Sequence, residues 1–148
     1  DVHRGRALPA GFDPLEELVL AARSRGLRVE AWIVANRIWK GKNEPPVGHV
    51  LREHPDWRLL DRQGKGDDGA AAPSVFLDPS IPGVRRHLAD VAADIVARYP
   101  VDAIHLDYIR YPGKEWGYGA ASLAATTRAG ATAPLRRIRP SSPGAATR

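Results

Sequence analysis

The sequence predicts an α/β fold in which parallel strands alternate with helices, the arrangement that closes into a (β/α)8 barrel. Three observations support this class. Amphipathic helical segments alternate with short apolar strands over residues 1–119. Polar residues gather where these strands end. The 148 residues are too few for a whole barrel, which takes about 250 residues, so we expect an incomplete one.

The first predicted helix spans about residues 13–26. Asp13 suits the N-cap position and Pro14 the first helical position. Gly26 ends the helix, because glycine readily adopts the left-handed conformation of a helix C-terminus. Apolar residues recur at spacings of three and four, which predicts one buried stripe made of Leu15, Leu18, Val19 and Ala22.

Strands and a second helix follow. One strand is expected at about residues 28–35 and a short one at 75–77, separated by a long connection over about 40–74. The longest helix is predicted over Pro82–Tyr99, where the following proline stops it. The last strand runs over about residues 102–108. Helix, strand, helix and strand at these lengths are typical of parallel α/β architecture.

The net charge of +5 comes from the end of the chain. All 17 acidic residues lie at or before Glu115, together with 17 of the 22 basic ones. From residue 120 onward the chain is rich in Ala, Thr, Arg, Pro and Ser. We therefore expect a disordered, low-complexity basic tail at 120–148 after a barrel domain at 1–119. Sparse arginines in a tail do not form a basic face, which argues against nucleic-acid binding.

Other features narrow the class of protein further. The chain has no cysteine, which excludes disulfides and cysteine-based metal sites. No apolar run reaches the roughly 18 residues of a membrane span. Residues 1–4 are neither a signal peptide nor an initiator methionine, so we expect the natural protein to begin earlier.

The last strand carries the leading candidate for chemistry. Strand alternation puts Ile104 and Leu106 on one face and His105 and Asp107 on the other. In a barrel the apolar face packs on helices, so His105 and Asp107 point to the interior. Asp107 lies near the carboxyl end of its strand, where barrel enzymes place catalytic groups. In a purely structural interpretation, Asp107 caps the next turn or pairs with Arg110.

The earlier strand predicts a sugar-binding surface. If Val29 and the alternate residues after it face the helices, then Trp32 and Asn36 face the interior. An indole offers a flat apolar surface to a sugar ring, and an amide can bond its hydroxyls. Arg37 follows at the same strand end, and Trp32 could equally fill the core. Asp78 lies on this rim or caps the next helix, and the cap is the favoured interpretation.

Several motifs, in order, resemble the glycosyl hydrolase-like 10 family of bacterial proteins. The most specific is the string VDAIHLDYIRYP at residues 101–112. Before it stand GLRVEAWI at 26–33, NR at 36–37, HPDW at 54–57 and LDP at 77–79. The resemblance covers about residues 12–123.

The resemblance implies a TIM-barrel glycosidase domain that hydrolyses O-glycosidic bonds of a polysaccharide, such as a cell-wall glycan, in an enzyme that is often exported. We expect no cofactor and no metal, and we expect Asp107 to be the catalytic residue, as nucleophile or general acid/base. Family members begin earlier and continue further, so the chain holds the middle of a barrel. The residues expected to bind the oligosaccharide are Trp32, Asn36, Arg37, Asp78, His105, Arg110 and Tyr111.

Glycoside hydrolysis normally needs two carboxyl groups, and Asp107 supplies one of them. Glu30 and Asp78 are candidates for the other, but a partner on a later strand outside this chain fits better. We therefore expect the chain to carry half of a catalytic pair.

Two other functions stay open. His105 and Asp107 on one strand face suit a metal-dependent hydrolase, although a metal site needs three or four ligands. The remaining histidines, His49, His54 and His87, show no paired spacing. A glycan-binding domain without catalysis would use the same aromatic and amide side chains. The oligomeric state is not encoded in any motif.

Overall fold

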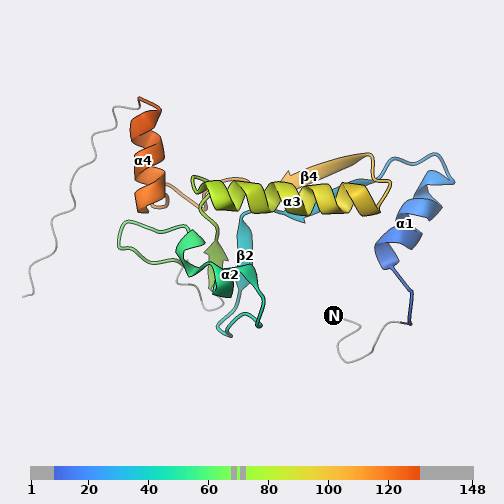
Figure 1. Ribbon diagram of the computed structural model, residues 1–148, viewed down its shortest axis with the longest axis horizontal. Coiled ribbons are helices and arrows are strands. Elements are labelled where there is room, and N and C mark those ends of the chain that lie inside the picture. Colours follow the sequence, from blue (N-terminus) through green and yellow to red (C-terminus); the bar gives the residue numbers. More distant parts are fainter. Residues whose placement is uncertain (1–8, 68–69, 71–72, 131–148) are drawn as a thin grey trace, which may run out of the picture.

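The computed structural model describes residues 9–67, 70 and 73–130. Helices and strands alternate as the α/β class predicts, and Figure 1 shows α3 running alongside β1 and β4, with α1 and α4 at opposite ends. In chain order the elements are α1 (Pro14–Arg23), β1 (Glu30–Val34), β2 (Arg37–Lys40), α2 (Val50–Glu53), the 3-10 turn η1 (Pro55–Trp57), β3 (Ser74–Phe76), α3 (Pro82–Arg98), β4 (Ala103–Asp107) and α4 (Ala120–Arg128).

The parallel pair β1–β4 is the element that positions the candidate site. Its register runs from Glu30 opposite Ala103 to Val34 opposite Asp107. Parallel neighbours need a long crossover, and α3 supplies it, which makes a β–α–β unit. The predicted parallel α/β arrangement is confirmed for this unit.

The second strand pair differs from the prediction. β2 and β3 pair antiparallel, with Arg37 opposite Phe76 and an irregular register before Trp39. β2 lies between the end of the predicted strand at about residue 35 and the start of the predicted connection at about residue 40. It was not predicted because its four residues show no alternation that separates them from a loop, and only the distant β3 stabilises it. The connection between them is partly helical, with α2 and η1 inside it.

Helix α1 begins as predicted. The Asp13 carboxyl group accepts hydrogen bonds from the amides of Leu15 (3.0 Å) and Glu16 (3.2 Å), which satisfies donors left free at a helix N-terminus. The helix gives way to a turn in which Gly26 takes a left-handed φ of 72°.

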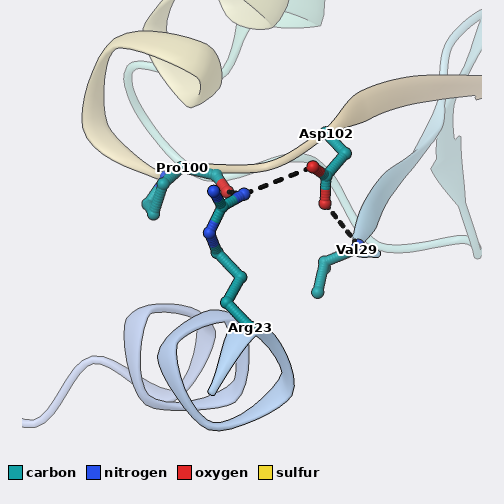
Figure 2. A network of polar contacts seen from close by, with 4 residues as sticks. All are labelled: Arg23, Val29, Pro100 and Asp102. Atoms are coloured by element: carbon teal, nitrogen blue, oxygen red, sulfur yellow. Dashed lines mark hydrogen bonds and ion pairs between the residues drawn. The ribbon is translucent and has the colours of Figure 1, made fainter. Parts of the chain in front are cut away.

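A polar network ties α1 to the starting ends of both parallel strands (Figure 2). The Asp102 carboxyl group accepts from the Val29 amide at 2.8 Å and from the Arg23 guanidinium at 3.2 Å. Arg23 also donates to the Pro100 carbonyl at 3.0 Å. The network therefore fixes where β1 and β4 begin, at the end of the sheet opposite Asp107.

A second bond links the ends of the two long helices. The Tyr99 hydroxyl donates to the other oxygen of Asp13 at 2.6 Å. This hydrogen bond is the main cause that lowers the pKa of the Asp13 carboxyl group and raises the pKa of the Tyr99 phenol. The N-cap of α1 is thus also the anchor for the C-terminus of α3.

The buried apolar residues concentrate around β3 rather than around the parallel pair. Val75, Phe76 and Leu77 are buried together with Leu51 and Leu59 of the connection and Val84 at the start of α3. On the parallel pair, by contrast, Trp32 is 69% exposed and Val34 and Leu106 are exposed as well. The β1–β4 sheet therefore presents large apolar surface that the described residues leave uncovered.

The stretch after residue 119 also departs from the prediction. Residues 120–128 form helix α4, and Ser122 within it is buried, so the expected disorder is wrong for this segment. Alanine favours helix, and long-range bonds of Ser122 attach α4 to the fold. Residues 131–148 of the predicted tail lie outside the described residues. Within the described chain, no helix is both long and apolar enough to cross a bilayer.

The Asp102 network gives a first testable prediction. Asp102→Ala leaves the Val29 amide without its acceptor and Arg23 with only the Pro100 carbonyl, which should lower the opening free energy of β1 by about 1–2 kcal/mol. Hydrogen exchange of the β1 amides in the natural protein measures this. The matched control is Asp94→Ala, which removes an exposed helix pair with Arg98 and should cost less than about 0.5 kcal/mol. Equal losses in both variants would contradict the assignment.

The Asp13–Tyr99 bond gives a second prediction. Because the folded-state pKa of Asp13 is lowered from 3.8, its contribution to stability is present above that value and is lost as the pH falls through the folded pKa. Tyr99→Phe removes the main cause, so the pKa of Asp13 should rise toward its ordinary value. Carboxyl-carbon NMR titration measures it, with Tyr118→Phe as control. An unchanged titration midpoint in Tyr99→Phe would exclude this coupling.

Candidate active site at the carboxyl end of the parallel strands

Asp107 occupies the last position of β4 at the end of the sheet where the two parallel strands finish. It lies opposite Val34 in the register, and its carbonyl accepts from the Ala35 amide at 2.8 Å. One carboxyl oxygen accepts from the amide of Tyr108 at 2.7 Å. This bond is part of the turn-capping interpretation; an ion pair with Arg110 does not occur in the described structure.

The predicted faces of β4 are confirmed at Ile104, Leu106 and His105, and Trp32 of β1 lies on the same face as His105. Ile104 and Leu106 line a cavity of about 430 Å³ against Leu88 and Ala92 of α3. On the other face, Trp32 and His105 are paired in register. Their ring centroids lie 4.8 Å apart, and the two ring planes are inclined at 42° to each other. Alternation places Asp107 on this second face, two residues or about 7 Å along the strand beyond His105.

The exposed Trp32–His105 pair is a suitable surface for a sugar ring. An indole face is flat and apolar, and the neighbouring imidazole can donate or accept a hydrogen bond. The pair lies nearer the centre of the sheet than Asp107 does. A ligand that contacts both would have to reach below the strand ends.

A cationic cluster surrounds Tyr108, the residue after Asp107. The Arg37 guanidinium lies 4.0 Å from the Tyr108 ring centroid, and that of Arg110 lies 5.8 Å from it. Both distances are within the range of cation–π attraction. The structure therefore brings the predicted residues Arg37 and Arg110 together at the strand end that carries Asp107.

Tyr108 itself has an uncommon backbone conformation. Its φ of 51° makes it the one non-glycine residue with positive φ in the described chain. A bulky residue in the left-handed region is held there only by its surroundings. Here the ring is held between Arg37 and Phe76, whose centroid is 6.4 Å away. The chain is thus turned sharply directly after Asp107.

Asn36 does not lie where alternation predicts. β1 ends at Val34, so the period of two ends before Asn36. The residue is 2% exposed and borders the cavity beside α3 rather than the Trp32–His105 face. Its side-chain amide makes no hydrogen bond within the described residues, while its backbone carbonyl accepts from the backbone amide of Leu77. The predicted position of Asn36 on the same face as Trp32 is therefore wrong.

Asp78 is neither on an open rim nor the N-cap of α3. The N-cap residue is Ile81, and Asp78 is 1% exposed. Its carboxyl oxygens accept from the Ser80 amide (2.9 Å), the Ser80 hydroxyl (2.6 Å) and the Ser122 hydroxyl (2.8 and 2.9 Å). The carboxyl group is occupied by these internal bonds, so the favoured cap prediction is wrong in its position.

Tyr111 is partly exposed but also contacts helix α4. Its hydroxyl lies 3.4 Å from the Ser122 hydroxyl. The ring lies so close to Gly117 that a Cβ there would meet it at 2.7 Å. The structure thus shows Tyr111 as a contact between the segment after β4 and helix α4.

The structural roles of two residues in this region were not predicted from the sequence. Ser122 lies in a stretch whose composition resembles a tail, and no local pattern marks a serine that bonds a carboxyl group 44 residues earlier. Tyr108 was part of the recognised string, but its left-handed backbone has no signal in a tyrosine side chain. Both depend on contacts between distant segments.

Among the residues that the structure describes, no group of three or more His, Cys, Asp and Glu side chains could hold a metal ion. The face that carries His105 and Asp107 therefore receives no third ligand from this part of the chain.

Comparison with known proteins decides the family. The model of the family described as glycosyl hydrolase-like 10 matches residues 3–140. The chain belongs to the glycosyl hydrolase-like 10 family. The matched range is longer than the motifs at 12–123 and continues into the stretch predicted as a tail.

Relatives with names of the same kind share this part of the sequence. The chain is 29% identical to glycosyl hydrolase YngK of Bacillus subtilis (strain 168) over 107 residues, and 29% identical to glycosyl hydrolase DigH of Escherichia coli (strain K12) over 117 residues. Each alignment covers 70% of the chain, but only 19% of YngK and 24% of DigH. The chain thus spans about a quarter or less of the length of these curated relatives.

Solved structures support the fold. The α-galactosidase TtGalA from Thermus thermophilus, in complex with stachyose, superposes with a TM-score of 0.53 at 24% identity. Its complex with p-nitrophenyl α-D-galactopyranoside gives 0.52 at 26% identity. Both cover 77% of this chain and 24% or 23% of TtGalA. The family member described here therefore shares a partial α/β fold with a glycosidase.

The packing of Tyr111 on Gly117 gives a third prediction. Gly117→Ala places a Cβ 2.7 Å from the ring at a φ of 88°, and should destabilise the local fold by about 1–3 kcal/mol. Faster exchange of the Gly117 and Tyr118 amides, which donate to the Leu60 carbonyl, would report it. Gly113→Ala is the control, because its Cβ would have no neighbour nearer than 4.0 Å. Equal exchange in both variants would contradict the prediction.

Proposed function

We propose that the natural protein containing this chain hydrolyses O-glycosidic bonds in a polysaccharide, with Asp107 as one of its two catalytic carboxyl groups. The observation that carries the proposal is the position of Asp107, at the carboxyl end of a parallel strand in a member of a glycosyl hydrolase-like family. In enzymes built from such β–α units as a barrel, the catalytic residues lie at the carboxyl end of the strands.

The surroundings of Asp107 support a carbohydrate substrate. Trp32 and His105 offer a ring surface on the same face. Arg37 and Arg110 add donors around Tyr108 that can bond sugar hydroxyls. A cell-wall glycan is the polysaccharide that we propose, in line with the resemblance of the motif string to bacterial proteins.

The second carboxyl group is assigned by exclusion. Catalytic pairs lie about 5–10 Å apart. Glu30 begins β1 opposite Ala103, four residues before the level of Asp107, which is a distance of about 13 Å along the strands. Asp78 is buried and occupied by serine hydroxyls. We infer that the partner carboxyl group belongs to a strand end of the natural protein outside the described residues.

The exposed sheet supports a barrel around this unit. Val34 and Leu106 are exposed on the parallel pair, and burying an apolar side chain contributes about 1.5–3 kcal/mol. Further strands and helices on both sides of β1 and β4 would cover them. We therefore propose that the unit is part of a (β/α)8 barrel.

A fourth prediction tests the function. Asp107→Asn in the natural protein should lower turnover of a bacterial cell-wall glycan by about 100- to 10,000-fold, the range for a lost acid–base group, while oligosaccharide binding persists. Reducing-end release measures turnover, and calorimetry measures binding. Asp94→Asn on the exposed face of α3 is the control and should keep full activity.

Two outcomes would overturn the proposal. Turnover by Asp107→Asn at the wild-type rate would remove Asp107 from catalysis. Oligosaccharide binding without any turnover by the wild-type protein would favour the glycan-binding alternative.

A further inference from the structure

A buried carboxyl group links three segments that are distant in the sequence. Asp78 follows β3, Ser122 lies in α4, and Tyr111 belongs to the β4–α4 loop, which we define as residues 108–119. Asp78 and Ser122 are 1% and 3% exposed. A carboxyl group so deeply buried is tolerated only with hydrogen-bond partners, and here these are hydroxyl groups of Ser80 and Ser122 together with the Ser80 amide.

The hydrogen bonds of Ser122 have a direction. Its hydroxyl proton points to the Asp78 carboxyl group, at 2.8 and 2.9 Å from the two oxygens. A hydroxyl has one proton, so toward Tyr111 the Ser122 oxygen acts as the acceptor. The Tyr111 hydroxyl, 3.4 Å away, is therefore the donor in that weaker contact. The order of donation runs from Tyr111 to Ser122 to Asp78.

The far end of the β4–α4 loop is attached to the segment around Leu60 and Asp61. The amides of Gly117 and Tyr118 donate to the Leu60 carbonyl at 3.0 and 3.1 Å. Trp116 forms an isolated bridge with Asp61 and packs 6.3 Å from the Phe76 ring. The far end of the loop is thus held by backbone bonds. Its near end, at Arg110 and Tyr111, has the Ser122 contact.

We propose that Asp78 and Ser122 are positioning residues that hold the near end of the β4–α4 loop, and through it Arg110, against Tyr108 and the carboxyl end of β4. The pair acts through Tyr111 and does not itself touch substrate. This inference deepens the proposed function and rests on it for its catalytic consequence.

The geometry favours a positioning role over simple packing. Tyr111 is 40% exposed, so burial alone does not hold its ring in one place. Its neighbour Arg110 is exposed, and its guanidinium lies 5.8 Å from the centroid of the Tyr108 ring. A fixed hydroxyl contact at Tyr111 limits how far this segment can move. A displacement of about 1 Å at a substrate contact can cost up to about 100-fold in rate.

The test compares Ser122→Ala and Tyr111→Phe with wild type in the natural protein. Trypsin can cut after Arg110 and Lys114 inside the loop, so the rate of cleavage there reports loop opening without any substrate. Tyr111→Phe should be cut about two- to three-fold faster, as expected for the loss of one weak hydrogen bond. Ser122→Ala should be cut about ten-fold faster or more, because it also removes a donor from the buried Asp78 carboxyl group. The double variant should be little worse than Ser122→Ala alone, because Ser122→Ala already breaks the contact that Tyr111→Phe removes.

Kinetics provide the readout of positioning. On the cell-wall glycan, KM should rise about two- to three-fold in Tyr111→Phe and about ten-fold or more in Ser122→Ala. In both variants kcat should be less affected, because Arg110 binds substrate and Asp107 is untouched. Thr127→Val is the matched control: it removes an exposed hydroxyl from the same helix, bonded only to the Leu123 carbonyl. It should change neither cleavage nor KM. Tyr111→Phe keeps the ring on Gly117, so a folded variant remains if Ser122→Ala unfolds.

Unchanged tryptic cleavage in Tyr111→Phe and Ser122→Ala would overturn the anchor. Faster cleavage with wild-type KM would overturn the positioning role. Faster cleavage in a protein whose wild type turns over no glycan would confirm the anchor and refute the proposed function, so the two failures are distinguishable.

Discussion

The parallel ladder between β1 and β4 is the constraint on which the candidate site depends. It sets Val34 opposite Asp107, so both strands end at the same level of the sheet. The polar segments that follow the two strands therefore begin side by side. At the opposite end, Asp102 binds the Val29 amide and Arg23 and holds the start of both strands. Without this register, Arg37 and Tyr108 would not meet, because they follow strands that are far apart in the sequence.

The distribution of burial separates a stabilising region from a reactive one. The buried apolar residues surround β3 and the start of α3. On the face that carries Asp107, Trp32 and His105 are exposed and Asp107 is half-buried. A site needs polar and aromatic groups that a ligand can reach, and Trp32 and His105 on this face meet that requirement. The antiparallel pair β2–β3 joins the two parts, since β2 begins with Arg37.

Local patterns predicted a large part of the fold. The N-cap at Asp13, the helix before Gly26, the helix from Pro82 and both parallel strands follow from capping chemistry and periodicity, which act within a few residues. The faces of Ile104, Leu106 and His105 followed from alternation for the same reason. Predictions failed where local order stops. Asn36 lies beyond the end of β1, and β2 exists only through pairing with β3.

The sequence by itself determined the α/β class, the position of Asp107 at a strand end and the resemblance to a glycosidase family, because these depend on residue order and short-range geometry. Only the tertiary structure determined that Asp78 and Ser122 are buried and bonded to each other. A carboxyl group leaving water must find donors wherever the fold supplies them, and here a donor comes from a helix 44 residues away. The same long-range requirement turns part of an apparent tail, residues 120–128, into an anchored helix.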